Sequence, residues 1–151
     1  NEYPPIRGFI DLIMEYDGET VIGEIKTAKQ EVWDTRQSEM KSSSNHMLQL
    51  LTYMKLKNAK EGFFLYENKN TQEILIIPIS MNEKNKALIE NAFRWMEEVY
   101  DNFKNGDLPV RPAGATKSKM PCTYCPIKKE CYDKSGPVGT VEIDLYEDYV
   151  L

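Results

Sequence analysis

Residues 8–29 constrain the fold of this chain most strongly, because they contain a β-hairpin signal. Two apolar runs flank Asp17-Gly18, a dipeptide that is typical of the two-residue turn between antiparallel strands. With these two residues as the loop, the expected register pairs Tyr16 with Glu19, Ile13 with Ile22, Asp11 with Glu24, and Phe9 with Lys26. Directly opposed residues share one face of a sheet, with Cβ atoms about 4.5–5.5 Å apart. The register therefore predicts two carboxylates and a lysine side by side.

The predicted pairing of Asp11 with Glu24 is unfavourable on a ribbon that is otherwise apolar. The same face carries Ile13, Ile22 and Phe9, and the other face carries Ile10, Leu12, Met14, Val21 and Ile25. This distribution predicts a ribbon that is buried on both faces. Two carboxylates in such surroundings repel each other unless a cation or a proton lies between them. The hairpin is therefore expected to bind a hard divalent metal ion, which prefers oxygen ligands.

Asp11 followed by Glu24-Ile25-Lys26 resembles the D…E-x-K core of the PD-(D/E)XK nuclease superfamily. Residues 8–11 are similar to the G-x-x-D form found in the RecB-like branch of that superfamily. The resemblance implies that Asp11, Glu24 and the Ile25 carbonyl bind Mg²⁺ or Mn²⁺. It also implies that Lys26 orients or activates a metal-bound water and offsets charge on the reacting phosphate. These roles are expectations for the residues of this chain.

Gln49 and Tyr53 resemble the Q-x-x-x-Y helix of the same branch. The resemblance implies that both act beside the catalytic lysine and contact DNA, as we also expect of Lys29. His46 is the only histidine, and it is expected at a helix start or behind the metal ligands rather than as a ligand. The family often has a metal-binding histidine before the G-x-x-D strand, and this sequence has none there.

Three cysteines follow in a compact arrangement, Cys122-x-x-Cys125-x₅-Cys131. They resemble the C-terminal iron–sulfur cysteines of these nucleases, which join one upstream cysteine to hold a four-iron four-sulfur (4Fe–4S) cluster. That fourth cysteine is absent from this sequence. Three alternatives therefore stay open: a cluster in the intact protein, a Zn²⁺ site completed by another residue, or free thiols. The expected role is structural.

Hydrophobic periodicity and turn residues predict the remaining elements. We expect a serine-rich loop over 27–45 with a short helical turn at about 32–40, helices over about 46–58 and 82–104, strands over 62–67 and 73–79, a loop over 109–121, and an edge strand or a trailing end over 138–151. This order predicts an α/β fold, a mixed sheet with helices on both faces. It suits the restriction-endonuclease-like core that the resemblance implies.

The length of 151 residues fits one domain with a single core. We expect a nuclease core over 1–110 with a cysteine-rich metal-binding segment and tail over 111–151 packed on it. Because the chain begins at Asn1 without a methionine and soon enters a strand, we expect it to lack an N-terminal part of the core.

The net charge of −5 does not favour DNA binding, although basic residues gather over 26–60 and 111–134. No apolar run is long enough to cross a membrane, and no signal peptide is visible. Three clustered cysteines suit a reducing compartment. We therefore expect a cytoplasmic protein that is prokaryotic or phage-encoded.

The resemblance is closest to the CRISPR-associated exonucleases of the Cas four family and to related phage and repair nucleases. It predicts a metal-dependent exonuclease that acts on single-stranded DNA or DNA ends, with CRISPR adaptation or recombination proteins as partners. A second hypothesis is a catalytically impaired module that binds DNA ends or a protein partner, which the missing upstream histidine favours. A third is a zinc-dependent adaptor in which the cysteine segment is the functional part.

Overall fold

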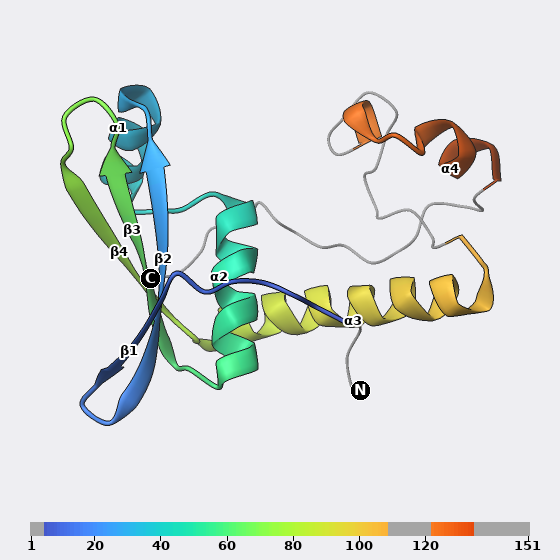
Figure 1. Ribbon diagram of the computed structural model, residues 1–151, viewed down its shortest axis with the longest axis horizontal. Helices are drawn as coiled ribbons and strands as arrows, with labels where there is room; N and C mark the ends of the chain where they lie inside the picture. Colours follow the sequence, from blue (N-terminus) through green and yellow to red (C-terminus); the bar gives the residue numbers. More distant parts are fainter. Residues whose placement is uncertain (1–4, 109–121, 135–151) are drawn as a thin grey trace. The chain divides into compact units, whose positions relative to one another are not determined.

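A computed structural model of the chain describes residues 5–108 and 122–134 (Figure 1). The described residues fall into two compact units, with 7–89 in one and 5–6, 90–108 and 122–134 in the other. The first unit contains a four-stranded sheet in the order β1-β2-β3-β4. All residues of the predicted nuclease centre belong to this unit.

The hairpin consists of β1 (Leu12–Tyr16) and β2 (Glu19–Ala28). Its ladder pairs Tyr16 with Glu19 and ends at Leu12 with Gly23, so the predicted register is confirmed over the whole of β1. Asp17 and Gly18 have φ values of 51° and 76°, as the tight two-residue turn between right-twisted strands requires.

The ladder does not continue to Asp11 and Phe9, so their predicted backbone pairs with Glu24 and Lys26 are not formed. The chain leaves the sheet before Leu12, and Phe9 is 77% exposed. The reason lies in the packing of Gly8, where an added Cβ would stand 2.7 Å from the Tyr53 hydroxyl oxygen. The lead-in therefore lies against a helix instead of extending the strand.

The connection from β2 to β3 (Glu61–Asn68) contains the helices α1 (Gln30–Glu39) and α2 (Ser44–Lys57). β2 and β3 are parallel, with Lys26 opposite Tyr66, whereas β4 (Ile74–Ser80) is antiparallel to β3. The predicted mixed sheet is thus confirmed. The predicted short turn over 32–40 is instead a ten-residue helix, because Trp33 packs into the core and is only 2% exposed.

Residues alternate between the two faces of the sheet, which differ sharply in burial. On the helix-covered face, every second residue of β3 is buried, and its core also includes Ile22, Met47, Leu50, Leu51, Met54, Ile77 and Ile79. Both α1 and α2 contact this face, through Gln30 to Asn68 and through His46 to Tyr66. It also carries Glu24 and Lys26.

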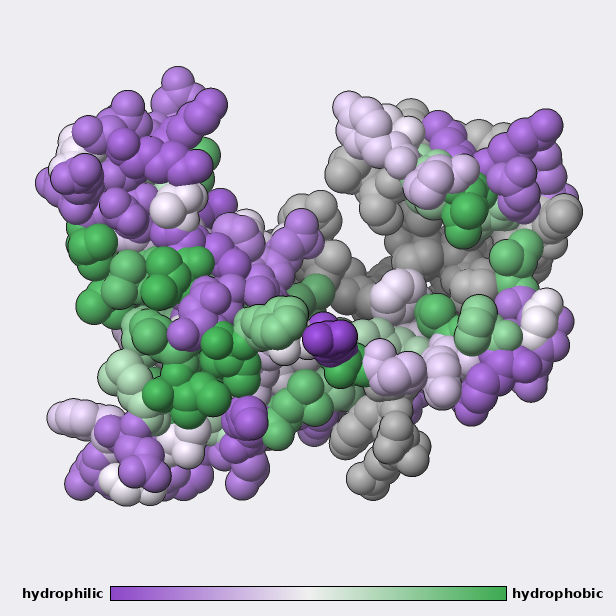
Figure 2. Space-filling model, viewed as in Figure 1, coloured by the Kyte–Doolittle hydropathy of each residue, from purple (hydrophilic) through white to green (hydrophobic). Residues whose placement is uncertain are grey.

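The opposite, open face of the sheet exposes large apolar side chains, among them Ile25, Met14, Ile74 and Ile76 at 43%, 43%, 54% and 54%. Figure 2 shows apolar side chains gathered over the sheet, between the hydrophilic surfaces of α1 and of the hairpin turn. The prediction that the hairpin is buried on both faces is therefore wrong. The helices α1 and α2 both lie on the face that carries Lys26 and Asn68, where Gln49 binds Lys26 and Gln30 binds Asn68.

The remaining elements of the described residues are α3 (Glu83–Asn105), a short 3₁₀ turn η1 (Cys122–Tyr124) and α4 (Lys128–Lys134). α3 ends before Gly106, whose φ of 76° is typical of the residue after a helix. The predictions for 109–121 and 138–151 lie outside the described residues. None of the helices in the described part of the chain has the length and apolar character needed to cross a lipid bilayer.

Candidate active site

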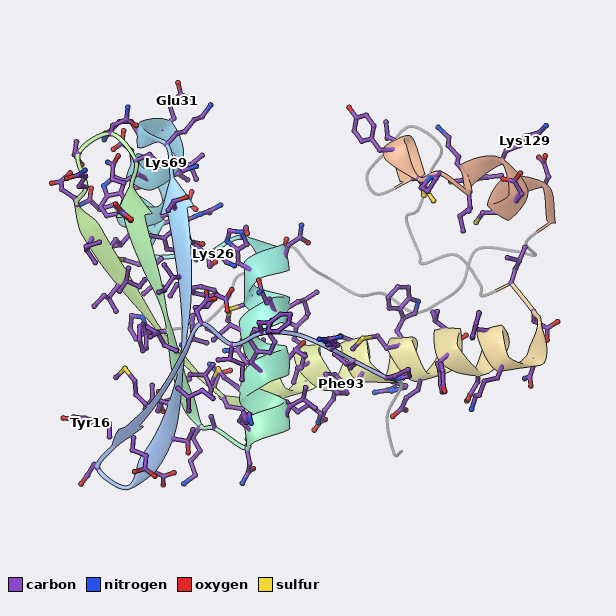
Figure 3. All side chains as sticks on the ribbon, viewed as in Figure 1. Tyr16, Lys26, Glu31, Lys69, Phe93 and Lys129 are labelled. Carbon is purple, nitrogen blue, oxygen red and sulfur yellow. The ribbon has the colours of Figure 1, made fainter. Side chains whose placement is uncertain are left out.

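The centre of the site is an ion pair on the helix-covered face. Figure 3 shows Lys26 on β2, on the side of the sheet toward α2. Its Nζ donates to Glu24 Oε1 at 2.6 Å and to Gln49 Oε1 at 3.0 Å. Glu24 and Lys26 share a face because they are two residues apart on one strand. The two acceptors fix the ammonium between β2 and α2.

Gln49 continues this network along one face of α2. Its Nε2 lies 3.4 Å from the Tyr53 hydroxyl, which is one helical turn further on. The ring of Tyr53 in turn occupies the space beside Gly8, where any larger residue would collide with it. The first residue of the G-x-x-D motif is thus a glycine because the lead-in must pass close to the tyrosine of the Q-x-x-x-Y motif.

Asp11 approaches Glu24 from the exposed edge of the same site. Its Oδ2 accepts a hydrogen bond of 2.9 Å from the Ile25 backbone N–H. Glu24 is 1% exposed in the folded chain, and its Oε2 is buried without a hydrogen-bond partner. Burial raises the pKa of the Glu24 carboxyl, Lys26 opposes this rise, and the nearby Asp11 adds to it. The predicted pair of adjacent carboxylates is therefore present.

These donors fit a hard divalent cation. A buried carboxylate oxygen without a partner is costly unless a positive group binds it. Mg²⁺ and Mn²⁺ prefer such oxygens, and Mg²⁺ usually takes only one or two carboxylates and keeps several waters. Over the described residues, no three His, Cys, Asp or Glu side chains gather closely enough to hold a metal ion. A centre here would therefore use Asp11 and Glu24 together with the Ile25 carbonyl and water.

A second polar cluster beside Lys26 was missed by the sequence interpretation. Tyr66 is 1% exposed, and its hydroxyl oxygen lies 2.7 Å from Ser42 Oγ and 2.8 Å from His46 Nδ1. Burial lowers the pKa of His46, and the charges of Lys26 and Arg36 lower it further. His46 is thus neutral at pH 7. The signal for this cluster is the parallel pairing of β2 with β3, which places Tyr66 next to Lys26.

Lys29 and the cysteines lie apart from this network in the sequence. Lys29 is exposed at the start of α1. Cys122 begins η1 and Cys131 lies in α4, and the side chains of all three cysteines are partly exposed. They are not among any group of three metal-ligating side chains in the described residues. The iron–sulfur or zinc site therefore stays a prediction.

The sequence profile of the PD-(D/E)XK nuclease superfamily matches residues 4–132, and the chain belongs to this superfamily. Its members are nucleases that bind DNA and use divalent metal ions such as Mg²⁺ or Mn²⁺. No curated protein matches the chain. Among solved structures it is similar to the crystal structure of SSO0001, with 17% identity and a TM-score of 0.46. That similarity covers 84% of this chain and 51% of the other, so this chain spans about half its length.

Proposed function

We propose that this chain is the catalytic part of a metal-dependent deoxyribonuclease of the RecB-like branch, an exonuclease acting on single-stranded DNA or DNA ends. The observation that carries the proposal is the buried Glu24 carboxylate near Asp11: its Oε2 has no hydrogen-bond partner, while its Oε1 binds Lys26. A structural ion pair does not require a second carboxylate or an unsatisfied oxygen. A metal-dependent phosphodiesterase requires both a cation site and an adjacent ammonium.

Each residue of the network has a distinct role in this proposal. Asp11, Glu24 and the Ile25 carbonyl would hold the metal ion, which supplies Lewis-acid chemistry and lowers the pKa of a bound water. Lys26 uses two of its three N–H donors on Glu24 and Gln49. The third donor is left for the reacting water or for a phosphate oxygen that gains negative charge. Gln49 fixes the ammonium, and Tyr53 keeps Gln49 in place beside the DNA strand.

The more specific assignments rest on the motif order. G-x-x-D, E-x-K and Q-x-x-x-Y in sequence favour the branch that includes the CRISPR-associated Cas four exonucleases and related phage and repair nucleases. We propose a cytoplasmic role in CRISPR adaptation, phage replication or recombination, with Lys29 as a further DNA contact. We also propose that Cys122, Cys125 and Cys131 bind a 4Fe–4S cluster whose fourth ligand lies elsewhere in the intact protein, or else Zn²⁺. Their C-x₂-C-x₅-C spacing supports this proposal.

One observation favours a second candidate function, a module that binds DNA ends without cleaving them. Among the described residues, only two carboxylates converge, and His46 is bound to Tyr66 rather than to this pair. A metal ion held by two carboxylates and one carbonyl is bound less tightly than one with a further protein ligand. In this alternative, Lys26 would serve only to contact phosphate.

The test is a cleavage assay on end-labelled single-stranded and duplex DNA with Mg²⁺, Mn²⁺ or EDTA. We expect metal-dependent release of short products, no release in EDTA, and no release by Asp11→Asn or Glu24→Gln. Glu15→Gln is the matched control. Glu15 is exposed on the same hairpin, so this variant should cleave like the parent. Cleavage by either site variant at the parental rate would overturn the assignment. DNA binding without cleavage under all metal conditions would favour the second candidate.

A further inference from the structure

Arg36 is a cation that the proposed chemistry does not use. It lies on α1 one turn after Trp33, so the two side chains share the face of α1 that packs into the sheet unit. Its Nε is buried without a hydrogen-bond partner, and no ion pair of its guanidinium is found among the described residues. A buried N–H without an acceptor costs about 1–3 kcal/mol, more for a charged group. Arg36 is therefore suited to bind an anion.

His46 provides a second donor near this guanidinium. Its Nδ1 is bound to the Tyr66 hydroxyl, so Nε2 is the ring nitrogen left for another partner. When Ser42 donates to Tyr66 and Tyr66 donates to Nδ1, the imidazole is neutral and carries its hydrogen on Nε2. Tyr66 is fully buried, so this cluster holds the His46 ring in a fixed position.

The charges around the cluster favour a negative ligand. The positive charges of Arg36 and Lys26 both lower the pKa of His46 and oppose the burial that raises the pKa of Tyr66. Both cations therefore lie close to this cluster. Lys26 is paired with Glu24, whereas the Nε of Arg36 has no hydrogen-bond partner among the residues that the structure describes. Arg36 is therefore the cation of this cluster that is left for a negative ligand.

We propose that Arg36 and His46 form a phosphate-binding subsite for the nucleic-acid strand, next to Lys26 and separate from the carboxylate pair. This inference rests on the proposed function, because it takes the strand to pass along the helix-covered face of the sheet. A guanidinium can bind two phosphate oxygens at once, and the imidazole adds one hydrogen bond. Such a contact positions the strand without reading its sequence.

The first measurement is the binding of a fluorescent single-stranded oligonucleotide, with EDTA present to prevent cleavage, over a series of salt concentrations. Arg36→Ala should weaken binding about tenfold and reduce the slope of log K against log salt by about 0.7, the value for one phosphate contact on a single strand. The affinity of Arg36→Lys should lie between those of the parent and Arg36→Ala. His46→Ala should lose less affinity than Arg36→Ala. Arg94→Ala is the matched control, since the Arg94 guanidinium on α3 already donates to Asn91.

The second measurement locates the contact with oligonucleotides that each carry one uncharged methylphosphonate. A methylphosphonate at one position should weaken binding by the parent but not by Arg36→Ala. This difference measures the coupling between the phosphate at that position and the Arg36 side chain. Inorganic phosphate should compete with the oligonucleotide only at far higher concentration. Arg36-dependent binding of inorganic phosphate without any Arg36 effect on DNA would overturn the nucleic-acid assignment. Circular dichroism and thermal unfolding of each variant show whether it is folded.

The outcomes separate this inference from the proposed function. If the parent cleaves DNA while Arg36→Ala keeps both affinity and salt slope, the subsite is wrong and the nuclease assignment stands. If no cleavage occurs but Arg36→Ala weakens DNA binding at one phosphate, the subsite stands and the nuclease assignment fails. An equal loss of affinity in Arg94→Ala would show only a general effect of charge and would overturn the subsite.

Discussion

The two faces of the sheet differ in where they place charge: the covered face buries a charged pair within its apolar core, and the open face exposes large apolar side chains. On the helix-covered face, β2 places Glu24 and Lys26 beneath α2, with the Glu24 side chain fully buried. On the open face, the same strand exposes Ile25, and Ile76 of β4 is more than half exposed. Ordinary sheets bury the apolar residues and expose the charged ones. The comparison teaches that burial of charge here follows the location of the site.

The covered face gives up stability for this arrangement. Glu24 has lost its water, has one oxygen without a partner and lies close to Asp11. Replacement of a buried ion pair by apolar residues is often neutral or stabilising, so such a pair is weak evidence of a structural role. Functional sites are commonly strained in this way, and the strain is offset by the surrounding core. Here that core is formed by α2 against β3.

The largest expected difference between the faces concerns stability. Ile77 and Ile76 are neighbours of the same type on β4, yet Ile77 is fully buried and Ile76 is 54% exposed. Ile77→Ala should lower the free energy of unfolding by about 2–5 kcal/mol, because it leaves a cavity in the core. Ile76→Ala should change it by about 0.5 kcal/mol or less. Urea unfolding measures both, and equal losses would show that the open face is covered in solution.

The next difference concerns catalysis by adjacent residues of β2. Lys26→Met should lower the rate of cleavage at saturating DNA by about 10²–10³, because it removes the ammonium from the reacting phosphate. Thr27→Ala, on the opposite face of the same strand, should cleave like the parent, since Thr27 is exposed and takes no part in the site. Single-turnover kinetics with an affinity measurement distinguishes the roles. A Lys26→Met protein that lost affinity and kept its rate would indicate a simple phosphate contact.

The smallest expected effect is a gain of stability when the metal is removed. In EDTA, Glu24→Gln should raise the free energy of unfolding at pH 7 by about 0.5–2 kcal/mol, the range of single stabilising substitutions. The pKa of Glu24 is raised above 4.5 in the folded chain, so the folded protein holds this proton more tightly than the unfolded chain does. Parental stability therefore falls as pH rises from about 4.5 through the raised pKa.

The pH series gives this prediction its control. The fall in unfolding free energy with rising pH that Glu24 causes should be absent from Glu24→Gln. Glu15→Gln, at an exposed position of the hairpin, should retain it. The difference in unfolding free energy between parent and Glu24→Gln should shrink as the pH is lowered. If this difference in unfolding free energy stayed constant between pH 4 and pH 8, ionisation of Glu24 would not destabilise the folded protein, and the prediction would be wrong.

The sequence was sufficient to predict the local parts of the fold and the site. The turn at Asp17-Gly18 fixes the hairpin register from Leu12 to Glu19 and beyond through backbone conformation alone. Asp11 lies beyond the end of this ladder and is held beside the site by its hydrogen bond from the Ile25 N–H. The two long helices and the strands β3 and β4 were expected within two residues of their observed bounds. Helical spacing likewise predicts that Gln49 and Tyr53 share a face.

The parts that were missed depend on contacts between segments far apart in the chain. The register of β2 with β3 is set across a crossover of two helices, so no local pattern places Tyr66 and His46 beside Lys26. α1 has no clear apolar stripe, and its helix depends on the burial of Trp33. The burial of one sheet face only could not be predicted, because apolar alternation does not indicate which face the helices cover.

The central claim, that Asp11 and Glu24 form a metal site, is tested most directly by the anomalous X-ray scattering of Mn²⁺ in crystals of the protein. We expect one anomalous peak within about 2.1 Å of an oxygen of each carboxylate, a distance typical of small divalent ions. The peak should be absent from crystals of Glu24→Gln grown in the same way. A peak elsewhere in the parent crystals, or an unchanged peak in Glu24→Gln, would contradict the account.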